Sequence, residues 1–316
     1  MTTVGLDIGG TKILGALVEE DGTIRARGRR DTPAGNPSAI IAGAADLIQE
    51  LAAQDPSVEA AGVACAGFLD RDRTTVVFAP NVAWRDEAVK AELERMTGKR
   101  VSLENDANAA TWGEFVHGSA GHVDDLMFLT IGTGVGGGVV IDGRLLRGAF
   151  GMGGELGHMR VVPDGHLCGC GIRGCLEQYA SGSALVREAR ALVASGAPGA
   201  TELKNRCDGD PDALTGQHIT EAAVDGDAAA IGLLAELGRW IGEGAGSLAA
   251  ILDPEVILIG GGVSQAGALL LDPAKEAFAA HITGKSFRPR AELKIADLRD
   301  DAGVVGAAAL ARGAAQ

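Results

Sequence analysis

The sequence contains the same order of short elements twice, once at its start and once after its first third. In each copy an apolar run leads into a glycine turn, a second apolar run follows, and an Asp-Gly pair separates it from a third run. Asp-Gly between apolar runs is typical of a tight β-hairpin, so each copy predicts three consecutive strands. A duplication on this scale predicts two related α/β domains facing one cleft. The predicted strands are 3–8, 13–18 and 23–27 in the first copy, and 126–131, 139–141 and 144–146 in the second.

The other apolar patterns complete an α/β prediction with two domains. We expect a small domain of residues 1–115 plus 301–316 and a large domain of residues 116–300. Residues 196–216, rich in Gly, Pro, Asp and Thr, predict a surface loop. The last predicted helix is expected to pack back on the N-terminal half. The predicted helices are 38–53, 86–97, 107–116, 183–195, 227–250 and 301–312, and the further strands are 58–66, 101–103 and 255–259.

Charge and composition narrow the possible partners. The 316 residues carry a net charge of -14 and only 3% aromatic residues. Both values argue against non-specific binding to nucleic acid, and the charge also argues against an anionic membrane surface. The N-terminus lacks a basic region followed by a long apolar stretch, and no apolar run approaches the length of a membrane span. We therefore expect a cytoplasmic protein.

The first glycine turn is a candidate phosphate loop. Its sequence at 7–12 is Asp-Ile-Gly-Gly-Thr-Lys. Gly9 and Gly10 permit a turn with exposed backbone N–H groups, to which Thr11 adds a hydroxyl and Lys12 a positive charge. Asp7, at a strand end, can hold a hydrated Mg²⁺. The alternative is an ordinary hairpin in which Asp7 only caps the turn.

The second glycine turn, at 132–138, matches the pattern G-x-G-x-x-G. A dinucleotide-binding loop of this pattern is followed by a helix, whereas here a strand and an Asp-Gly turn follow, so we reject that interpretation. We expect phosphate to be held between the two hairpin loops, with Thr133 and Gly134 as contacts. A glycine turn needed only for close packing is the alternative.

Two further motifs are ambiguous on their own. Residues 104–108, Glu-Asn-Asp-Ala-Asn, can be an ordinary helix N-cap or can supply a carboxylate base for an alcohol in phosphoryl transfer. Residues 260–264, Gly-Gly-Gly-Val-Ser, follow a buried strand. A helix starting there can leave backbone room for an adenosine at Gly261 and Gly262, or the segment is a plain turn.

A cluster of three cysteines and one histidine predicts a metal site. Cys168, Cys170 and Cys175 follow His158 closely, and a Cys₃His set matches a closed tetrahedral zinc site. Because four ligands leave no position for water, we interpret the zinc as structural. The alternatives are unligated buried thiols or a redox pair. A metal there would fix the neighbouring Glu155 and Glu177, which suits recognition of polyol hydroxyls.

Together these motifs resemble the ROK family of sugar kinases and repressors, and within it the actinobacterial glucokinases. The resemblance spans nearly the whole chain, and its most specific part is 154–177. It implies an actin-like, ribonuclease H-like fold and ATP-dependent phosphorylation of a hexose, with glucose as the leading substrate. It also implies Mg²⁺ with ATP, structural Zn²⁺ and a homodimer or homotetramer.

The resemblance also implies roles for individual residues. Asp106 resembles the base that takes the proton of the sugar 6-hydroxyl, and His158 serves both zinc and sugar. The sugar contacts implied are Gly67, Asn81, Asn105, Asp106, Glu155, His158 and Glu177, the nucleotide contacts are Asp7, Gly9, Gly10, Thr11, Lys12, Thr133, Gly134, Gly261 and Gly262, and the zinc ligands are His158, Cys168, Cys170 and Cys175.

One departure and several alternatives accompany this resemblance. Ala66 stands where the family usually has Pro, which bears on the stiffness of the loop at 64–70. N-acetylmannosamine, fructose or allose as substrate, and polyphosphate as donor, remain open. A family repressor would carry an additional N-terminal helix-turn-helix domain, and the first motif already begins at Asp7, so we expect a kinase.

Overall fold

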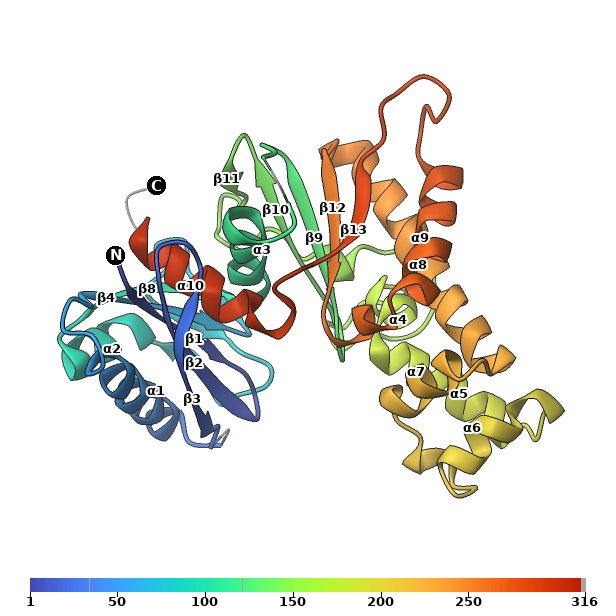
Figure 1. Ribbon diagram of the computed structural model, residues 1–316, viewed down its shortest axis with the longest axis horizontal. Helices are drawn as coiled ribbons and strands as arrows, with labels where there is room; N and C mark the ends of the chain where they lie inside the picture. Colours follow the sequence, from blue (N-terminus) through green and yellow to red (C-terminus); the bar gives the residue numbers. More distant parts are fainter. Residues whose placement is uncertain (34, 121, 314–316) are drawn as a thin grey trace. The chain divides into compact units, whose positions relative to one another are not determined.

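The computed structural model describes residues 1–33, 35–120 and 122–313, and two five-stranded sheets organise them (Figure 1). The first sheet has the order β3-β2-β1-β4-β8, and the second has the corresponding order β11-β10-β9-β12-β13. The repeated order confirms the duplication predicted from the sequence. The strands of the first sheet are β1 (Thr3–Ile8), β2 (Lys12–Val18), β3 (Ile24–Asp31), β4 (Ala60–Cys65) and β8 (Arg100–Asn105), and those of the second are β9 (Leu126–Ile131), β10 (Val135–Ile141), β11 (Arg144–Leu145), β12 (Val256–Gly260) and β13 (Glu292–Ile295).

Local turn chemistry explains how each copy begins. Asp142 and Gly143 both have positive φ, at 51° and 70°, as a two-residue type I′ hairpin between β10 and β11 requires. A strand, β10, follows the second glycine turn, which confirms that this turn does not open a dinucleotide-binding helix.

The chain divides into two compact units. Unit 1 comprises Met1–Asp124, Gly138–Gly154 and Asp297–Gln316, and unit 2 comprises Asp125–Gly137 and Glu155–Ala296. Residues 138–154 therefore pack with the N-terminal residues, and the domain boundaries expected from the sequence stay a prediction.

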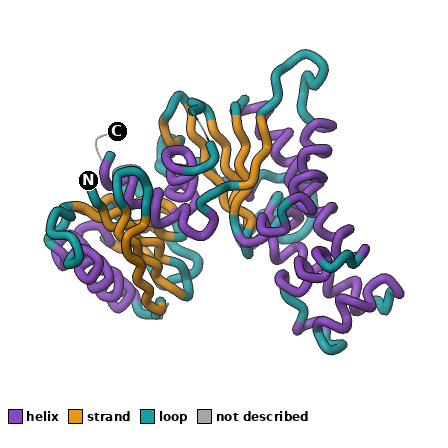
Figure 2. The backbone as a smooth tube through the Cα atoms, viewed as in Figure 1, coloured by secondary structure: helices purple, strands orange, loops and turns teal. Residues whose placement is uncertain are grey.

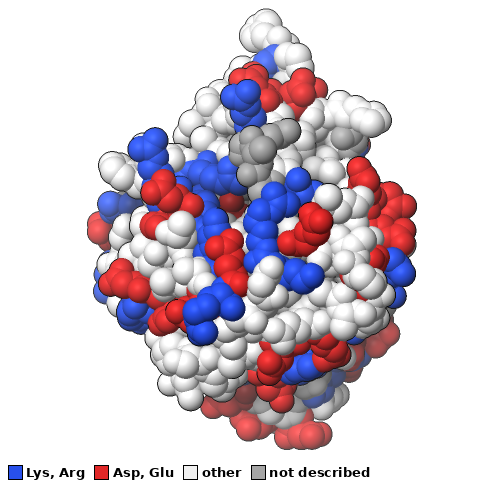
Figure 3. Space-filling model, turned by 90° about the vertical axis from the view of Figure 1, so that its left-hand side faces the viewer, with Lys and Arg blue, Asp and Glu red and all other residues white. Residues whose placement is uncertain are grey.

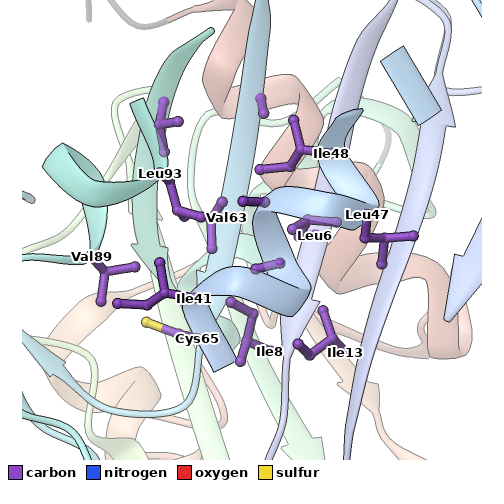
Figure 4. Close-up of a cluster of buried hydrophobic side chains, with 14 of the residues drawn as sticks. Leu6, Ile8, Ile13, Ile41, Leu47, Ile48, Val63, Cys65, Val89 and Leu93 are labelled. Atoms are coloured by element: carbon purple, nitrogen blue, oxygen red, sulfur yellow. The ribbon is translucent and has the colours of Figure 1, made fainter. Parts of the chain in front are cut away.

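In unit 1, helices cover both faces of the first sheet (Figure 1). Helices α1 (Pro37–Ala52) and α2 (Val89–Thr97) cover one face, where their side chains join those of the strands in a large apolar core (Figure 4). Helices α3 (Asp106–His117) and α10 (Ala302–Arg312) cover the other face.

The closing helix α10 approaches the sheet very closely. A Cβ atom at Gly62 of β4 would lie 1.7 Å from the backbone oxygen of Ala307, so only glycine permits this contact. The packing of α10 on β1 and β4 confirms the prediction that the last helix returns to the N-terminal half.

Unit 2 is mostly helical beyond its strands (Figure 2). The predicted loop at 196–216 is wrong, because Pro198 and Pro211 each start a short 3₁₀ helix and an α-helix lies between them. Among the residues that the structure describes, no helix is long and apolar enough to cross a membrane. The helices of unit 2 are α4 (Glu177–Ala180), α5 (Gly182–Ala194), α6 (Thr201–Arg206), α7 (Gly216–Val224), α8 (Ala228–Leu252) and α9 (Ala268–His281), with short 3₁₀ helices at Leu156–His158, Pro198–Ala200, Pro211–Ala213 and Gly262–Ala266.

Several smaller elements were not predicted from the sequence. A small antiparallel sheet in unit 1 consists of β5 (Phe68–Leu69), β6 (Val76–Phe78) and β7 (Arg85–Glu87). Strand β13 of unit 2 was not predicted either, and the helix considered at 260–264 is a short 3₁₀ helix, Gly262–Ala266, with α9 starting only at Ala268. Each of these elements is short or lacks a clear apolar period, so long-range packing determines it.

Candidate functional site

The carboxyl ends of three parallel strands gather the predicted polar residues of unit 1. Cys65 at the end of β4 pairs with Ile8 of β1 on one side and with Asn105 of β8 on the other. Asp7 and Asp106 therefore lie at the same edge of the sheet, on either side of β4. Open α/β sheets bind ligands at this edge, so the register places both carboxylates where a site is expected.

Asp106 is the first residue of α3, but Asn105 is the residue that caps this helix. The Asn105 side chain accepts a hydrogen bond of 3.0 Å from the backbone N–H of Asn108. Asp106 accepts the N–H of Ala107, at 2.9 Å through Oδ1. Burial raises the pKa of Asp106 above its ordinary value. A carboxylate whose pKa is raised is a stronger base, so Asp106 has the properties of a proton acceptor.

Asp7 is the second perturbed carboxyl group of this edge. Burial and, after it, the charge of Asp106 raise the pKa of Asp7 to about 7, against the opposing charge of Lys12. Two nearby carboxylates with little access to water attract a hard cation, and carboxylate oxygens are the ligands that Mg²⁺ prefers. The residues therefore fit the Mg²⁺ expected at Asp7.

The loop between β1 and β2 is held by its own backbone and by Thr32. The Gly9 N–H donates to the Lys12 carbonyl at 3.0 Å, and the Thr32 hydroxyl donates to the Gly9 carbonyl at 2.8 Å. A Cβ atom at Gly10 would lie 2.9 Å from Cβ of Asn81, so Gly10 packs directly on Asn81. Thr11 and Lys12 are exposed at the tip of the loop, which leaves the hydroxyl and the ammonium group available to an anion.

The loop that carries Ala66 is fixed by hydrogen bonds in unit 1. The Asn105 side chain donates to the Gly67 carbonyl at 3.3 Å, which joins two of the predicted sugar contacts. Further along, the Asp70 carboxylate accepts the Thr74 and Thr75 N–H groups at 2.8 and 3.1 Å. These bonds lower the pKa of Asp70 and hold the loop without the family's usual proline.

Unit 2 contains a pocket of about 1150 Å³ at the glycine turn between β9 and β10. Thr133 and Gly262 line this pocket, whereas Gly134 packs against Glu177 and Gly261 packs against Ile131. Sequence reasoning missed the walls from α5 and α7. Their N-cap residues, Ser181 and Thr215, were the signal that could have located them. The walls that were missed include Gly182, Ser183, Val186, Gly216, Gln217, Thr220 and Gln265.

The four predicted zinc ligands come together in unit 2. The ligand atoms of His158, Cys168, Cys170 and Cys175 all lie within 4.8 Å of one another. The His158 Nδ1 to Cys168 Sγ distance and the Cys170 to Cys175 Sγ distance are both 3.6 Å. Tetrahedral Zn²⁺ with ordinary bond lengths separates such atoms by about 3.6–3.8 Å, so the residues fit this ion.

The two glutamates near this cluster have different surroundings. Glu155 Oε2 lies 3.9 Å from Nε2 of His158, the ring nitrogen that does not face the thiols. Glu177 accepts the Val135 N–H at 3.1 Å through Oε2, and the Cys168 thiol donates to its Oε1 at 3.4 Å. Glu177 thus links the cysteine cluster to the glycine turn that lines the pocket.

Glu104 supports the segment around Asp106, a role that the sequence did not reveal. Its buried carboxylate lies 2.8 Å from Nε of Arg147 and 3.4 Å from Nε of Arg73. Its Oε1 also accepts the Asn105 N–H at 3.0 Å and the Asn108 side-chain amide at 3.2 Å. Glu104 therefore fixes the segment that presents Asp106. The residue stood in the predicted motif, but nothing local revealed its burial or its arginine partners.

The sequence and the structure are both similar to those of known proteins. Residues 3–314 match the model of the ROK family. The chain is 44% identical to a glucokinase of Streptomyces coelicolor over 98% of this chain and 97% of that protein, and 33% identical to an N-acetylmannosamine kinase of Citrobacter koseri over 99% of both. Its structure is similar to that of a ROK family glucokinase from Streptomyces griseus in complex with glucose and AMPPNP, with a TM-score of 0.89 and 46% identity over 99% of both chains. The chain belongs to the ROK family.

Proposed function

We propose that this protein is an ATP-dependent glucokinase that transfers the γ-phosphate of ATP to the 6-hydroxyl of D-glucose. The Streptomyces glucokinases that it resembles, one of them in complex with glucose and AMPPNP, support the reaction class and both substrates. The observation that carries the proposal is Asp106, a partly buried carboxyl group whose pKa is raised by loss of contact with water. It lies at the carboxyl edge of parallel strands, and its neighbour Asn105 caps its helix.

In the proposed mechanism Asp106 accepts the proton of the 6-hydroxyl as its oxygen attacks the γ-phosphorus. Because phosphoryl transfer depends mostly on positioning and on charge, the other residues orient the two substrates. Mg²⁺ held near Asp7 would neutralise charge on the phosphates. We assign the sugar to Gly67, Asn81, Asn105, Asp106, Glu155, His158 and Glu177, and the nucleotide to Asp7, Gly9, Gly10, Thr11, Lys12, Thr133, Gly134, Gly261 and Gly262.

We assign a structural role to Zn²⁺ bound by His158, Cys168, Cys170 and Cys175. With four protein ligands the ion has no open position for a reacting water. The ion would order the segment between His158 and Glu177. Because Glu177 accepts a hydrogen bond from the Val135 N–H, it would also order the glycine turn that precedes β10.

A panel of sugars with ATP or polyphosphate, followed by coupled spectrophotometry, tests the substrate and the donor together. The Asp106→Asn variant should lose about 10²–10⁴-fold in kcat while its dissociation constant for glucose stays close to that of the wild type. Asp86→Asn, which changes an exposed aspartate of β7, serves as the control and should keep wild-type kcat. Near-normal turnover by Asp106→Asn would refute the role of this residue as base.

An N-acetylmannosamine kinase is the second candidate, because a relative with that name is 33% identical over the full length of both chains. The same panel decides between the two candidates. A higher kcat/KM with N-acetylmannosamine than with glucose would replace the proposed substrate and keep the reaction class. The family resemblance also favours a homodimer or homotetramer, which sedimentation equilibrium would test.

A further inference from the structure

Unit 1 contains a second pocket, which lies beside the edge strand β8. Its volume is about 660 Å³, within the range of small-molecule sites, which is roughly 300–1,000 Å³. Its walls come from β8, α3, β11 and the end of α10, all of which belong to unit 1. None of the residues assigned above to sugar, nucleotide or zinc lines this pocket.

The charge of this pocket is opposite to that of the whole chain. Seven Lys and Arg residues and three acidic residues line it, although the chain as a whole has 28 basic and 42 acidic residues. Figure 3 shows Lys and Arg side chains gathered on the face of the molecule drawn there. The basic residues of the pocket are Arg71, Arg73, Lys90, Arg100, Arg144, Arg147 and Arg312, and the acidic ones are Glu20, Asp72 and Glu104.

At least four of the seven positive charges have no ion-pair partner among the residues that the structure describes. In residues 1–33, 35–120 and 122–313, no carboxylate lies within ion-pairing distance of Arg71, Lys90, Arg100 or Arg144. Positive charges that converge on one concave surface repel one another and focus a positive potential into the hollow. A bound anion would remove that repulsion.

Arg312, at the end of α10, adds a further positive charge to the pocket wall. Its guanidinium group donates to the Glu19 carbonyl at 3.0 Å and lies 3.1 Å from Nε2 of His117. Burial lowers the pKa of Arg312, and burial together with the Arg312 charge lowers the pKa of His117. The lowered pKa favours the neutral form of the histidine, and the carbonyl group that accepts from the arginine is uncharged as well.

The wall also contains guanidinium hydrogens that no protein atom accepts. Nε and Nη2 of Arg73 are buried and have no hydrogen-bond partner among the described residues, although Glu104 lies 3.4 Å from Nε. A buried donor without an acceptor costs roughly 1–3 kcal/mol. The Nη1 atom of Arg73 donates to the Gly151 carbonyl at 2.8 Å, so Nε and Nη2 are the nitrogens that would gain from a nearby acceptor.

The chemistry of the lining indicates which anion fits. Guanidinium groups bind phosphate through two parallel N–H bonds, which explains a preference for phosphate where arginine dominates. The pocket also has an apolar side that includes Trp112, Val116 and Leu310, which inorganic phosphate would leave uncovered. We propose that this pocket binds a small organic phosphate that carries at least two phosphate charges, and that Glu104 transmits its presence to Asp106.

The route from the pocket to Asp106 is short. Glu104 lines the pocket, binds Arg147 at 2.8 Å, and accepts the Asn105 N–H at 3.0 Å through its other oxygen. A phosphate that attracts Arg147 competes with Glu104 for this guanidinium group. The carboxylate that positions Asn105 then loses its strongest partner, so occupancy of the pocket alters the placement of Asp106.

Isothermal titration calorimetry with fructose 1,6-bisphosphate as probe tests the site. The protein is first saturated with glucose and a non-hydrolysable ATP analogue, so that the proposed active site is closed to the probe. The double variant Arg71→Gln, Arg144→Gln removes two exposed charges of the pocket, and the matched control Lys275→Gln, Lys285→Gln removes two exposed charges of unit 2. We expect the pocket variant to bind the probe about tenfold more weakly than the wild type, or weaker still. The control variant should bind it with wild-type affinity.

Three results would overturn the proposed binding site. The first is that the wild type gives no measurable heat with millimolar probe, and the second is that both double variants bind the probe equally weakly. The third is that the wild type binds inorganic pyrophosphate as tightly as the probe. Titration with glucose alone reports separately on the proposed function. At fixed free Mg²⁺, the probe should change kcat or KM of the wild type and leave both constants of the pocket variant unchanged. Identical kinetics with and without the probe would refute the transmission through Glu104.

Discussion

Replacing Asp7 by asparagine should stabilise the protein in a pH-dependent way. The pKa of Asp7 is raised from 3.8 to about 7, first by burial and then by Asp106. The folded state therefore holds this proton more tightly than the unfolded state does. The contribution of Asp7 to the free energy of unfolding is therefore largest at low pH. It is lost as the pH rises from the pKa of the unfolded state through that of the folded state. Asparagine cannot ionise, so Asp7→Asn removes this loss.

The magnitude follows from the two pKa values. One pKa unit corresponds to about 1.4 kcal/mol, so the difference between 3.8 and about 7 corresponds to about 4 kcal/mol once Asp7 is fully ionised. Roughly 2 kcal/mol of this appears between about pH 5.5 and about pH 8. The stability advantage of Asp7→Asn over the wild type should therefore grow by that amount between the two pH values.

Urea unfolding followed by tryptophan fluorescence measures this difference, without Mg²⁺ or nucleotide in the buffer. Trp84 and Trp112 both lie in unit 1, so the signal reports mainly on the unit that contains Asp7. Asp272→Asn, which changes an exposed residue of α9, is the control and should show no such growth. An advantage of Asp7→Asn that is the same at both pH values would refute the reasoning.

Three other changes test separate parts of the structure. Cys170→Ser should abolish stoichiometric zinc, measured by mass spectrometry of the metal content, while Cys207→Ser, outside the cluster, should keep it; equal zinc in both would contradict the assigned ligands. Gly62→Ala should lower the free energy of unfolding by about 1–3 kcal/mol or more, because the added methyl group would collide with the backbone of α10. Gly43→Ala is the control: it lies in the interior of α1 with room for a methyl group, and should raise the free energy of unfolding by up to about 1 kcal/mol. Glu104→Gln leaves the guanidinium groups of Arg73 and Arg147 without their carboxylate and should lower the free energy of unfolding in urea by about 3–5 kcal/mol. An unchanged midpoint would show that these ion pairs contribute nothing to stability.

The sequence was most informative where a few neighbouring residues determine the structure. Asp142 and Gly143 specify a hairpin by their own backbone preferences, so the duplicated strand order could be predicted. The three cysteines lie within one short segment, and His158 is ten residues before the first of them. The structure brings all four ligand atoms together as predicted, because short glycine-rich chains can hardly separate them.

The rest depends on packing between distant segments. Glu104 meets Arg147 across 43 residues of sequence, and no local pattern reveals that pair. The pocket walls from α5 and α7 are likewise contributed by helices whose ends carry only ordinary capping residues. The short helices within 196–216 were masked by their turn-forming composition, although buried Leu203 anchors one of them.

The packing of α10 sets the order in which the chain can fold during synthesis. Strands β1 and β4 are among the first to leave the ribosome, but the helix that covers one face of them is made of residues 302–312. Unit 2 ends at Ala296, so all of its residues are synthesised before that helix. The face that α10 shares with α3 is therefore only partly covered for most of translation, and apolar surface of the N-terminal sheet stays exposed during that interval.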